Sequence, residues 1–581
     1  MPKYPNEMIL SSVDGTQHNP IALRMKPLLQ TTTRRTHPLQ SVGFCTLTPF
    51  PRPGPHKSNF LAEVFLLLLA TVASAQETVP VSIGERQLFL DDHAIAKVDG
   101  LQRTMHQPKK RGAVVKPDVP SDGNLLEVRA APIWDETERV YKMFYMAMPM
   151  DDHRLIGMAL AVSKDGLQWD KPDWGQQIEI RGSTKNNRIA VEHKPGVRDT
   201  YFMNVVYDPD DPDAGRRYKA LYGSDYRIPI VSPDGIRWTR LAVPRLASAD
   251  ESSLVYDRKH RRFLAWLKTG NKYGRAHNLT ISQDFRIWSK SQLSFGADDE
   301  DQPLALKFIR ERIADRSLSR PVFVDDDPAL GKPVRAGPQT WRAECYYTGV
   351  FPYEGLYIGF PSMYYPTGVN ANGNNCDGFD LIQLACTRDL LTWTRLGNRE
   401  PFIPPGQIDD GRVGVWDRVQ MFATEPLVRD DELWIYYSGL KYRENPYEFN
   451  SDRSRRDPKS LSAEERADQA EGMGAICLAV LRRDGFVSLD GGKGPGTITT
   501  KPFKWSGTKL MANVETKERG ELRAEVLDTE GAVIATSQPI KGNRPRGEFG
   551  WSPALPKSLP GQQVSLRFTL REASFYAWWT E

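Results

Sequence analysis

The stretch SKDGLQW, at residues 163–169, recurs along the chain and determines which fold we expect. Related stretches are SPDGIRW (232–238), SQDFRIW (282–288) and TRDLLTW (387–393). An alternating apolar run, such as FDLIQLAC, precedes each stretch and is typical of a strand with one buried face. Asp-Gly then provides a tight turn, because glycine accepts positive φ and aspartate bonds to its own backbone. The repeat predicts four β-hairpins with a buried tryptophan; for the copies without glycine we expect another turn type.

Each hairpin belongs to a longer unit of four predicted strands. For example, RAAPIWDETERVYKMFYMA (129–147) forms a strand pair before the first hairpin, and a fifth unit ends in RRDGFVSL (482–489). Five such antiparallel units are typical of a β-propeller. Residues 500–581 keep the alternation but lack the hairpin motif. The expected fold class is therefore all-β, with a five-bladed β-propeller over residues 76–495 and a small C-terminal β-sandwich over 500–581.

Residues 1–75 are not expected to belong to the fold. VFLLLLATV (64–72) followed by ASA (73–75) has the pattern of a signal peptide with a small-residue cleavage site. The apolar run is too short to span a membrane. We expect cleavage near Gln76 and a secreted or periplasmic protein without a membrane span. Residues 1–56 are too long for the basic region of a signal peptide, so the true translation start is expected downstream.

Charge and cysteine content exclude several classes of protein. Residues 76–581 contain 70 basic and 70 acidic side chains, which gives no support to a nucleic-acid-binding surface. The chain has five cysteines but no CxxC pair and no histidine at ligand spacing, so we expect neither a metal nor another cofactor. The acidic clusters at 208–213, 298–301 and 324–328 do not have the spacing of an EF-hand and are expected to be solvated loops.

The hairpins, the predicted sandwich and the strand containing FLDD (89–92) resemble the furanosidase-type glycoside hydrolases. These are the invertase/levanase-like and arabinanase/xylosidase-like families, and the nearest resemblance is to uncharacterised secreted bacterial invertase-like proteins. The resemblance covers about residues 82–580 and implies a carbohydrate substrate. Invertase-like enzymes carry N-D-P-N-G and R-D-P motifs, which no predicted propeller strand contains here. Glu344-Cys345 matches their E-C acid motif, although in the fourth unit rather than the third.

In a propeller the first strand of each blade lines the central channel, and the starts of these strands share one face. Carboxylates stand at these predicted starts, and loops on the same face add groups able to bind a sugar. The candidate catalytic residues are Glu127, Asp199, Asp250 with Glu251, Glu344 and Asp417. The candidate substrate-binding residues are Arg129, His153, Arg275 and Tyr364. Converging carboxylates raise a pKa on one member, as glycoside hydrolysis requires.

These observations predict a secreted glycoside hydrolase that cleaves an oligo- or polysaccharide with paired carboxylates in the propeller funnel. Glu344 is the expected acid, and Asp199 or Asp250 is the expected ionised partner. The missing family motifs leave a second hypothesis open, a non-catalytic glycan-binding or scaffold propeller. A phosphorylase is a third hypothesis and would need a basic pocket, for which Arg129 and Arg275 are candidates.

Overall fold

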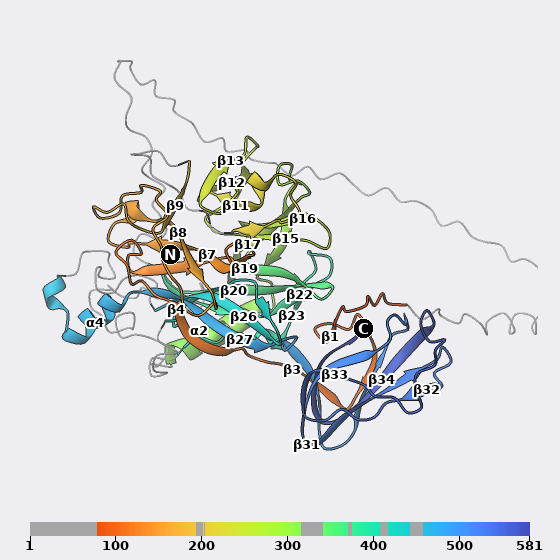
Figure 1. The fold of residues 1–581 in the computed structure, drawn as a ribbon. Helices are drawn as coiled ribbons and strands as arrows, with labels where there is room; N and C mark the ends of the chain where they lie inside the picture. Colours follow the sequence, from red (N-terminus) through yellow and green to blue (C-terminus); the bar gives the residue numbers. More distant parts are fainter. Residues whose placement is uncertain are drawn as a thin grey trace, which may run out of the picture. The chain divides into compact units, whose positions relative to one another are not determined.

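The computed structural model describes residues 78–192, 202, 204–314, 341–369, 375–406, 416–441 and 457–581. These residues fold mainly as β-strands, so the predicted all-β class is confirmed (Figure 1). Two α-helices occur in this part of the chain, α2 (Asp301–Ala314) and α4 (Ala463–Glu471). None of the described helices is long and apolar enough to cross a membrane. The predicted signal segment and translation start lie outside the described residues.

Apart from the C-terminal sheet, the strands form five successive groups of antiparallel neighbours, and short parallel pairings join groups one, two and five into one sheet of 15 strands. Group one contains β5 (Leu125–Val128), β7 (Val140–Met148), β8 (Gly157–Ser163) and β9 (Arg188–Val191), with β6 (Ile133–Asp135) beside β7. Group two contains β10 (Val206–Tyr207), β11 (Tyr218–Tyr222), β12 (Tyr226–Ser232) and β13 (Arg237–Arg240), with β14 (Leu246–Ala247) on β12. Group three contains β15 (Ser252–Asp257), β16 (Arg262–Asn271), β17 (Gly274–Ser282) and β18 (Gln292–Gly296).

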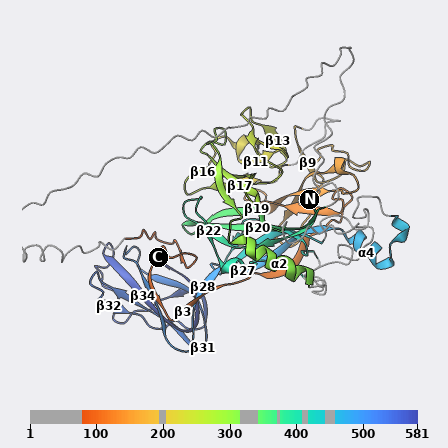
Figure 2. The same ribbon diagram turned by 180° about the vertical axis from the view of Figure 1, so that it is seen from behind.

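The last two groups have additional strand segments. Group four contains β19 (Glu344–Tyr353), β20 (Leu356–Val369), β22 (Ala385–Thr387) and β23 (Thr394–Arg395), and β21 (Asn375–Ile382) also pairs with β20. Group five contains β24 (Gln420–Ala423), β26 (Glu432–Leu440), β27 (Gly474–Arg482) and β4 (Lys109–Val115), with β25 (Leu427–Arg429) on β26. Helix α2 contacts β20, as seen from behind in Figure 2.

The five groups are connected through their first strands and through the start of the chain. β15 contacts both β10 and β19, β19 contacts β24, and β5 contacts β26 of group five. β4 precedes group one in the sequence but pairs with β27, where Val115 lies opposite Ile476. A segment from the beginning of the chain therefore completes the sheet of the last group.

The four predicted hairpins share one hydrogen-bond pattern. In the first, the Ser163 hydroxyl accepts the N–H of Gly166 at 2.8 Å, and the Asp165 carboxylate accepts the N–H groups of Leu167 at 2.8 Å and Gln168 at 2.9 Å. In every copy the aspartate accepts the two equivalent N–H groups. The side chains of this seven-residue motif therefore determine its backbone conformation.

The fourth residue of each hairpin adopts a left-handed backbone conformation. φ is +78° at Gly166 and +81° at Gly235, but also +61° at Phe285 and +69° at Leu390. The expectation of another turn type for the copies without glycine was therefore wrong. Phe285 and Leu390 are buried in apolar clusters, and this packing offsets the cost of about 1–3 kcal/mol for a left-handed non-glycine residue.

The hairpin tryptophans are buried to different degrees. Trp238 is only 3% exposed and donates its indole N–H to Gly235 at 2.8 Å. Trp169, Trp288 and Trp393 pack against apolar clusters but remain partly exposed, which differs from the expectation of full burial. The second copy therefore has the most buried tryptophan of the four.

The C-terminal sheet is organised around β34 (Gln563–Thr580), which pairs over most of its length with β31 (Leu510–Leu527). Its other strands come from both ends of the chain: β1 (Gln87–Leu88), β2 (Ile95–Asp99), β3 (Leu101–Met105), β28 (Val487–Gly491), β29 (Gly496–Thr500), β30 (Phe503–Lys504), β32 (Val533–Thr536) and β33 (Asn543–Glu548). One apolar cluster runs through these strands and includes Phe503, Phe568 and Trp578. Strands β1–β3 and β28, which lie within the predicted propeller bounds 76–495, therefore belong to the C-terminal sheet instead, and only β4 of the segment before group one pairs with group five.

Replacing Trp238 by alanine is expected to lower the free energy of unfolding by about 3–5 kcal/mol, because it removes a buried ring and leaves a cavity. Trp288→Ala is the matched control, since Trp288 is partly exposed and its indole N–H forms no hydrogen bond to any described residue. Urea denaturation followed by circular dichroism measures both changes. Equal shifts of the two midpoints would contradict this ranking.

Candidate functional site

Two glutamates at the starts of first strands share one arginine. Arg129 lies 2.8 Å from Glu127 of β5 and 2.9 Å from Glu251, the residue before β15. All three side chains are completely buried. Burial alone would lower the pKa of Arg129, but Glu251 and Glu127 raise it above its ordinary value. For Glu127, burial raises the pKa, and the opposing effect of Arg129 is smaller. The three groups form a buried ion network that connects groups one and three.

Asp250 is the more accessible carboxylate of this region. Its side chain is 35% exposed and lies 2.8 Å from the ammonium group of Lys268, which is 3% exposed and stacks 3.6 Å above the ring of Tyr346. Burial alone would raise the pKa of Asp250, but Lys268, with Arg275 and Arg227, lowers it below its ordinary value. Asp250 is therefore an ionised carboxylate that borders solvent.

Glu344 begins β19 and is held between two arginines. Its carboxylate lies 2.5 Å from Arg275 and 2.6 Å from Arg342, and it accepts the backbone N–H of Arg275 at 3.2 Å. Tyr364 lies opposite Glu344 in the β19–β20 pairing, and its ring is 5.2 Å from the guanidinium of Arg275. A Cβ at Gly274, where φ is +122°, would lie 2.5 Å from the carboxyl carbon of Glu344. Only glycine allows the hairpin backbone to approach this carboxylate.

Asp380, on β21, is a buried carboxyl group that the sequence analysis did not select. It is 1% exposed, and burial raises its pKa well above the ordinary value against the opposing effects of Gln420, Arg275 and Lys268. The same cations that influence Asp250 are therefore within electrostatic reach of Asp380. Its signal in the sequence is an aspartate inside the apolar run FDLIQLAC, away from the start of a first strand.

His277, on β17, is a second buried polar residue of this region. It lies opposite Lys268 in the β16–β17 pairing and is 1% exposed. Burial and Lys268 lower its pKa to about 3, so its ring is neutral. Neither ring nitrogen has a hydrogen-bond partner among the described residues.

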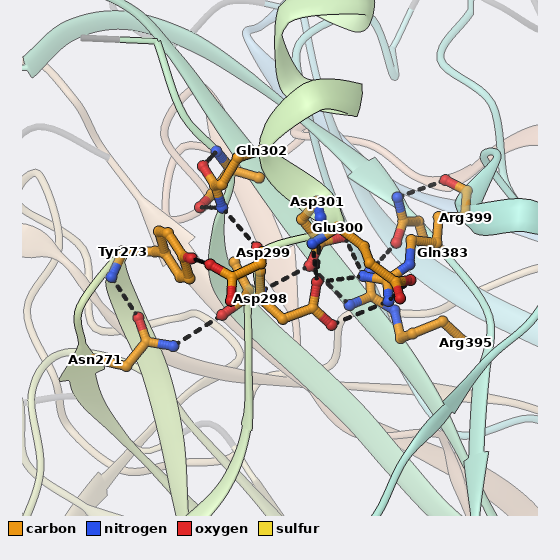
Figure 3. Close-up of polar contacts among 12 residues, drawn as sticks. Asn271, Tyr273, Asp298, Asp299, Glu300, Asp301, Gln302, Gln383, Arg395 and Arg399 are labelled. Carbon is orange, nitrogen blue, oxygen red and sulfur yellow. Dashed lines mark hydrogen bonds and ion pairs between the residues drawn. The ribbon is translucent and has the colours of Figure 1, made fainter. Parts of the chain in front are cut away.

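An acidic loop fixes the hairpin that carries Arg275 (Figure 3). Asn271 donates to the carbonyl of Ala297 at 3.0 Å, and the hydroxyl of Tyr273 contacts Asp299. Asp301, which begins α2, lies 2.8 Å from Arg399. Asp301 is buried and ion-paired, which differs from the expected solvated loop, whereas Asp298, Asp299 and Glu300 are exposed as expected.

The acidic cluster at 208–213 is paired with a buried lysine. In the cluster at 208–213, Asp208 and Asp211 lie 3.0 Å and 2.8 Å from Lys219, so these carboxylates are also paired rather than solvated. Residues 324–328 lie outside the described residues. No group of three or more potential metal ligands occurs among the residues that the structure describes.

Asp417, another predicted catalytic residue, lies in group five, away from these carboxylates. Asp417 is completely buried, 2.7 Å from Lys110 of β4 and 2.8 Å from the hydroxyl of Tyr437, so its partners belong to group five. Asp199 and the side chain of His153 lie outside the described residues.

The structure therefore brings together two neighbouring sets of charged groups. One contains Glu127, Arg129 and Glu251, and the other contains Asp250, Lys268, Arg275, Tyr346, Tyr364, Glu344 and Asp380. The ring of Phe422 connects them, since it lies 4.0 Å from the Arg129 guanidinium and 5.5 Å from the Tyr346 ring. We refer to the second set as the Asp250–Asp380 cluster.

No protein-family model and no curated protein matches the chain. Solved structures that are similar to it include an N-acetylgalactosamine deacetylase from F. plautii in complex with blood group B trisaccharide, at 14% identity and a TM-score of 0.37, covering 67% of this chain and 97% of that one. A glycoside hydrolase family 43 arabinoxylan arabinofuranohydrolase from Bacillus subtilis is 9% identical with a TM-score of 0.33, covering 81% and 99%. A fructofuranosidase from Schwanniomyces occidentalis is 8% identical with a TM-score of 0.33, covering 80% and 96%.

These neighbours include furanosidases, the class that the hairpin motifs of this chain resemble. At these identities and TM-scores, the similarity does not define the chemistry of the site. The function has to be inferred from the residues of the chain itself.

Gly274→Ala is expected to destabilise the protein by about 1–3 kcal/mol, because the new methyl group would overlap Glu344 and the backbone conformation is unfavourable for alanine. Gly492→Ala is the control, since Gly492 is exposed and a Cβ there meets nothing within 4 Å. The urea midpoint is the measurement. If both variants unfold at the wild-type midpoint, Glu344 is not held tightly against the hairpin.

Asp250→Asn and Asp380→Asn are expected to change stability in opposite directions at pH 8. The first leaves Lys268 buried without its carboxylate and should cost about 1–2 kcal/mol, less than for a fully buried pair because solvent screens Asp250. The second removes a group that resists ionisation in the folded state, so it should stabilise the protein.

The pH dependence tests the cause of each effect. Because the folded-state pKa of Asp380 is raised, wild type loses stability as pH rises from about 4, so the advantage of Asp380→Asn should shrink as pH falls towards 4. Because the folded-state pKa of Asp250 is lowered, its contribution should persist at pH 5 and be lost only in more acidic solution. Asp99→Asn, which breaks an exposed pair with Lys97, is the control and should show neither trend. Melting temperatures across this pH range provide the measurement.

Proposed function

We propose that the chain is a glycoside hydrolase that uses the Asp250–Asp380 cluster to cleave a glycosidic bond. The observation that carries this proposal is the placement of two aspartates around shared cations, with Asp250 at the solvent border 2.8 Å from Lys268 and Asp380 buried within electrostatic reach of Lys268 and Arg275. Asp380 has a raised pKa and Asp250 a lowered one, and Lys268 and Arg275 act on both. A pair of carboxyl groups whose environments separate their pKa values can supply one proton donor and one anion, the two functions that glycoside hydrolysis needs.

In this proposal Asp380 holds the proton that is transferred to the leaving oxygen. Asp250 remains ionised on Lys268 and acts as the base for water or as the nucleophile. This assignment moves the acid from Glu344, whose ion pairs with Arg275 and Arg342 fit better with orienting Arg275. The rings of Tyr346 and Tyr364 are buried and flank Arg275, so in this proposal they hold its guanidinium in place rather than contact the sugar.

We also propose that the five groups of strands are the blades of a propeller and that the C-terminal sheet forms a sandwich beside it. Two observations support this architecture. The first strands of groups two to five contact one another in sequence, and β5 of group one contacts β26 of group five. In addition, β4 joins the last group to the start of the chain. The carbohydrate would be met outside the cytoplasm, which is supported by the signal-peptide pattern of residues 64–75.

A non-catalytic glycan-binding propeller is the alternative, supported by the absence of the invertase motifs and by the complete burial of Glu127, Glu251 and Arg129. A phosphorylase has less support, because Arg129 and Arg275 are both paired with carboxylates rather than available to a phosphate.

Hydrolysis should be detected by release of reducing sugar from arabinan, xylan, inulin or levan and from chromogenic furanosides and pyranosides. Asp380→Asn and Asp250→Asn should each lower kcat by about 10²-fold or more, because each removes a group that transfers a proton or supplies the anion. Glu548→Gln, which breaks an exposed pair with Lys509, is the control and should keep wild-type activity.

The outcomes separate the alternatives. Glycan binding without any release would favour the binding propeller. Release that persists in both aspartate variants would place the chemistry on other residues. Release that needs inorganic phosphate would favour the phosphorylase.

A further inference from the structure

A second feature of the first strands is a cavity of about 310 Å³. Its walls include one or more residues from every group of strands, among them Ala131, Val206, Val255, Val350 and Glu425. A cavity of this volume is at the lower end of the range for small-molecule sites. Because five separate segments of the chain converge on it, the cavity is a property of the whole arrangement of groups rather than of one loop.

The cavity and the Asp250–Asp380 cluster lie at different ends of these strands. Glu344 begins β19, whereas Val350 of the same strand lines the cavity. Six residues of extended chain separate them, which corresponds to about 20 Å. The same order holds for β15, where Glu251 precedes the strand and Val255 lines the cavity. A ligand in this cavity would therefore be distinct from the sugar of the proposed active site.

The lining is apolar apart from one carboxyl group and three phenols. Glu425 lies deep in the molecule but remains partly reachable by solvent, because it borders the cavity. Burial raises its pKa to about 7, although its own N–H and that of Ala131 favour the ionised form. The hydroxyl of Tyr353 donates to Asp484 at 2.7 Å, and that of Tyr256 bonds to Asp208. Few polar groups are therefore left to bind a polyol such as a sugar.

We propose that this cavity binds a small organic cation, an amine carried on one apolar ring, with the ammonium group on Glu425. The ring would contact the valine side chains and the aromatic faces, and the charge would be neutralised by the single carboxylate. A metal ion fits less well, since it needs several oxygen ligands and the lining contains one carboxylate. The proposal is independent of the hydrolase assignment.

Benzylamine is a suitable probe, and benzyl alcohol is its neutral counterpart. We expect the full chain to bind benzylamine in isothermal titration calorimetry at pH 8 and to bind benzyl alcohol roughly 10-fold to 100-fold more weakly. Glu425→Gln, which keeps the size of the side chain, should remove this preference. Asp250→Asn, at the other end of β15, should leave benzylamine binding unchanged.

A pH series provides a readout that needs no variant. The groups that face Glu425 from the neighbouring strands are the phenols of Tyr207, Tyr256 and Tyr353, and Tyr347 interacts with it electrostatically. Tyrosines ionise near pH ~10, so none of these groups should titrate between pH 5.5 and 8. Benzylamine affinity should fall about tenfold or more from pH 8 to pH 5.5 as Glu425 becomes protonated.

Four results would overturn the proposal. They are no benzylamine binding by wild type, equal binding of the alcohol, unchanged binding by Glu425→Gln, and loss of binding in Asp250→Asn. The last result would assign the amine to the Asp250–Asp380 cluster.

Discussion

The buried contact of Arg129 with Glu127 and Glu251 is the constraint on which the central part of the structure depends. A charge removed from water costs several kcal/mol unless it is paired with good geometry. Arg129 can be neutralised only if β5 of group one and the start of β15 in group three lie within about 3 Å of its guanidinium. An apolar core alone would tolerate small displacements between these groups. The ion network does not, so it determines how the first strands meet.

The Asp250–Asp380 cluster uses the position that this network creates. Phe422 contacts Arg129 on one side and Tyr346 on the other, and Tyr346 supports Lys268. Each cation in the sequence Arg129, Lys268, Arg275 therefore lies against an aromatic ring and next to a carboxylate. Such alternation keeps several ionised groups in a small buried volume, because each charge has a partner and each ring excludes water. It also leaves Asp380, whose pKa burial raises, as the carboxyl group best suited to retain a proton.

The sequence predicted the repeated elements well and the site only in part. The hairpins could be recognised because Ser163, Asp165 and their equivalents form local hydrogen bonds that need no information from the rest of the chain. Glu127, Asp250 and Glu344 were found because strand starts can be located from alternation. Asp380 and Lys268 were missed. The raised pKa of Asp380 and the pairing of Lys268 with Asp250 both depend on burial between strands that are distant in the sequence. The turn at Phe285 was mispredicted for the same reason, because tertiary packing offsets the cost of its backbone conformation.

The first strands have a polar cluster near their starts and an apolar cavity near their ends. This difference follows from the way the strands converge. Near their starts, residues such as Glu344 and Glu251 are close to loops, and long charged side chains from neighbouring groups can reach them. Towards their ends, Val255 and Val350 place short branched side chains inward, and these are too small to fill the space between five groups. The remaining volume is bordered by Glu425, whose carboxyl group lacks a cationic side chain among its resolved interactions. The Asp250–Asp380 cluster is thus internally neutralised, whereas the cavity retains one carboxylate for an external cation.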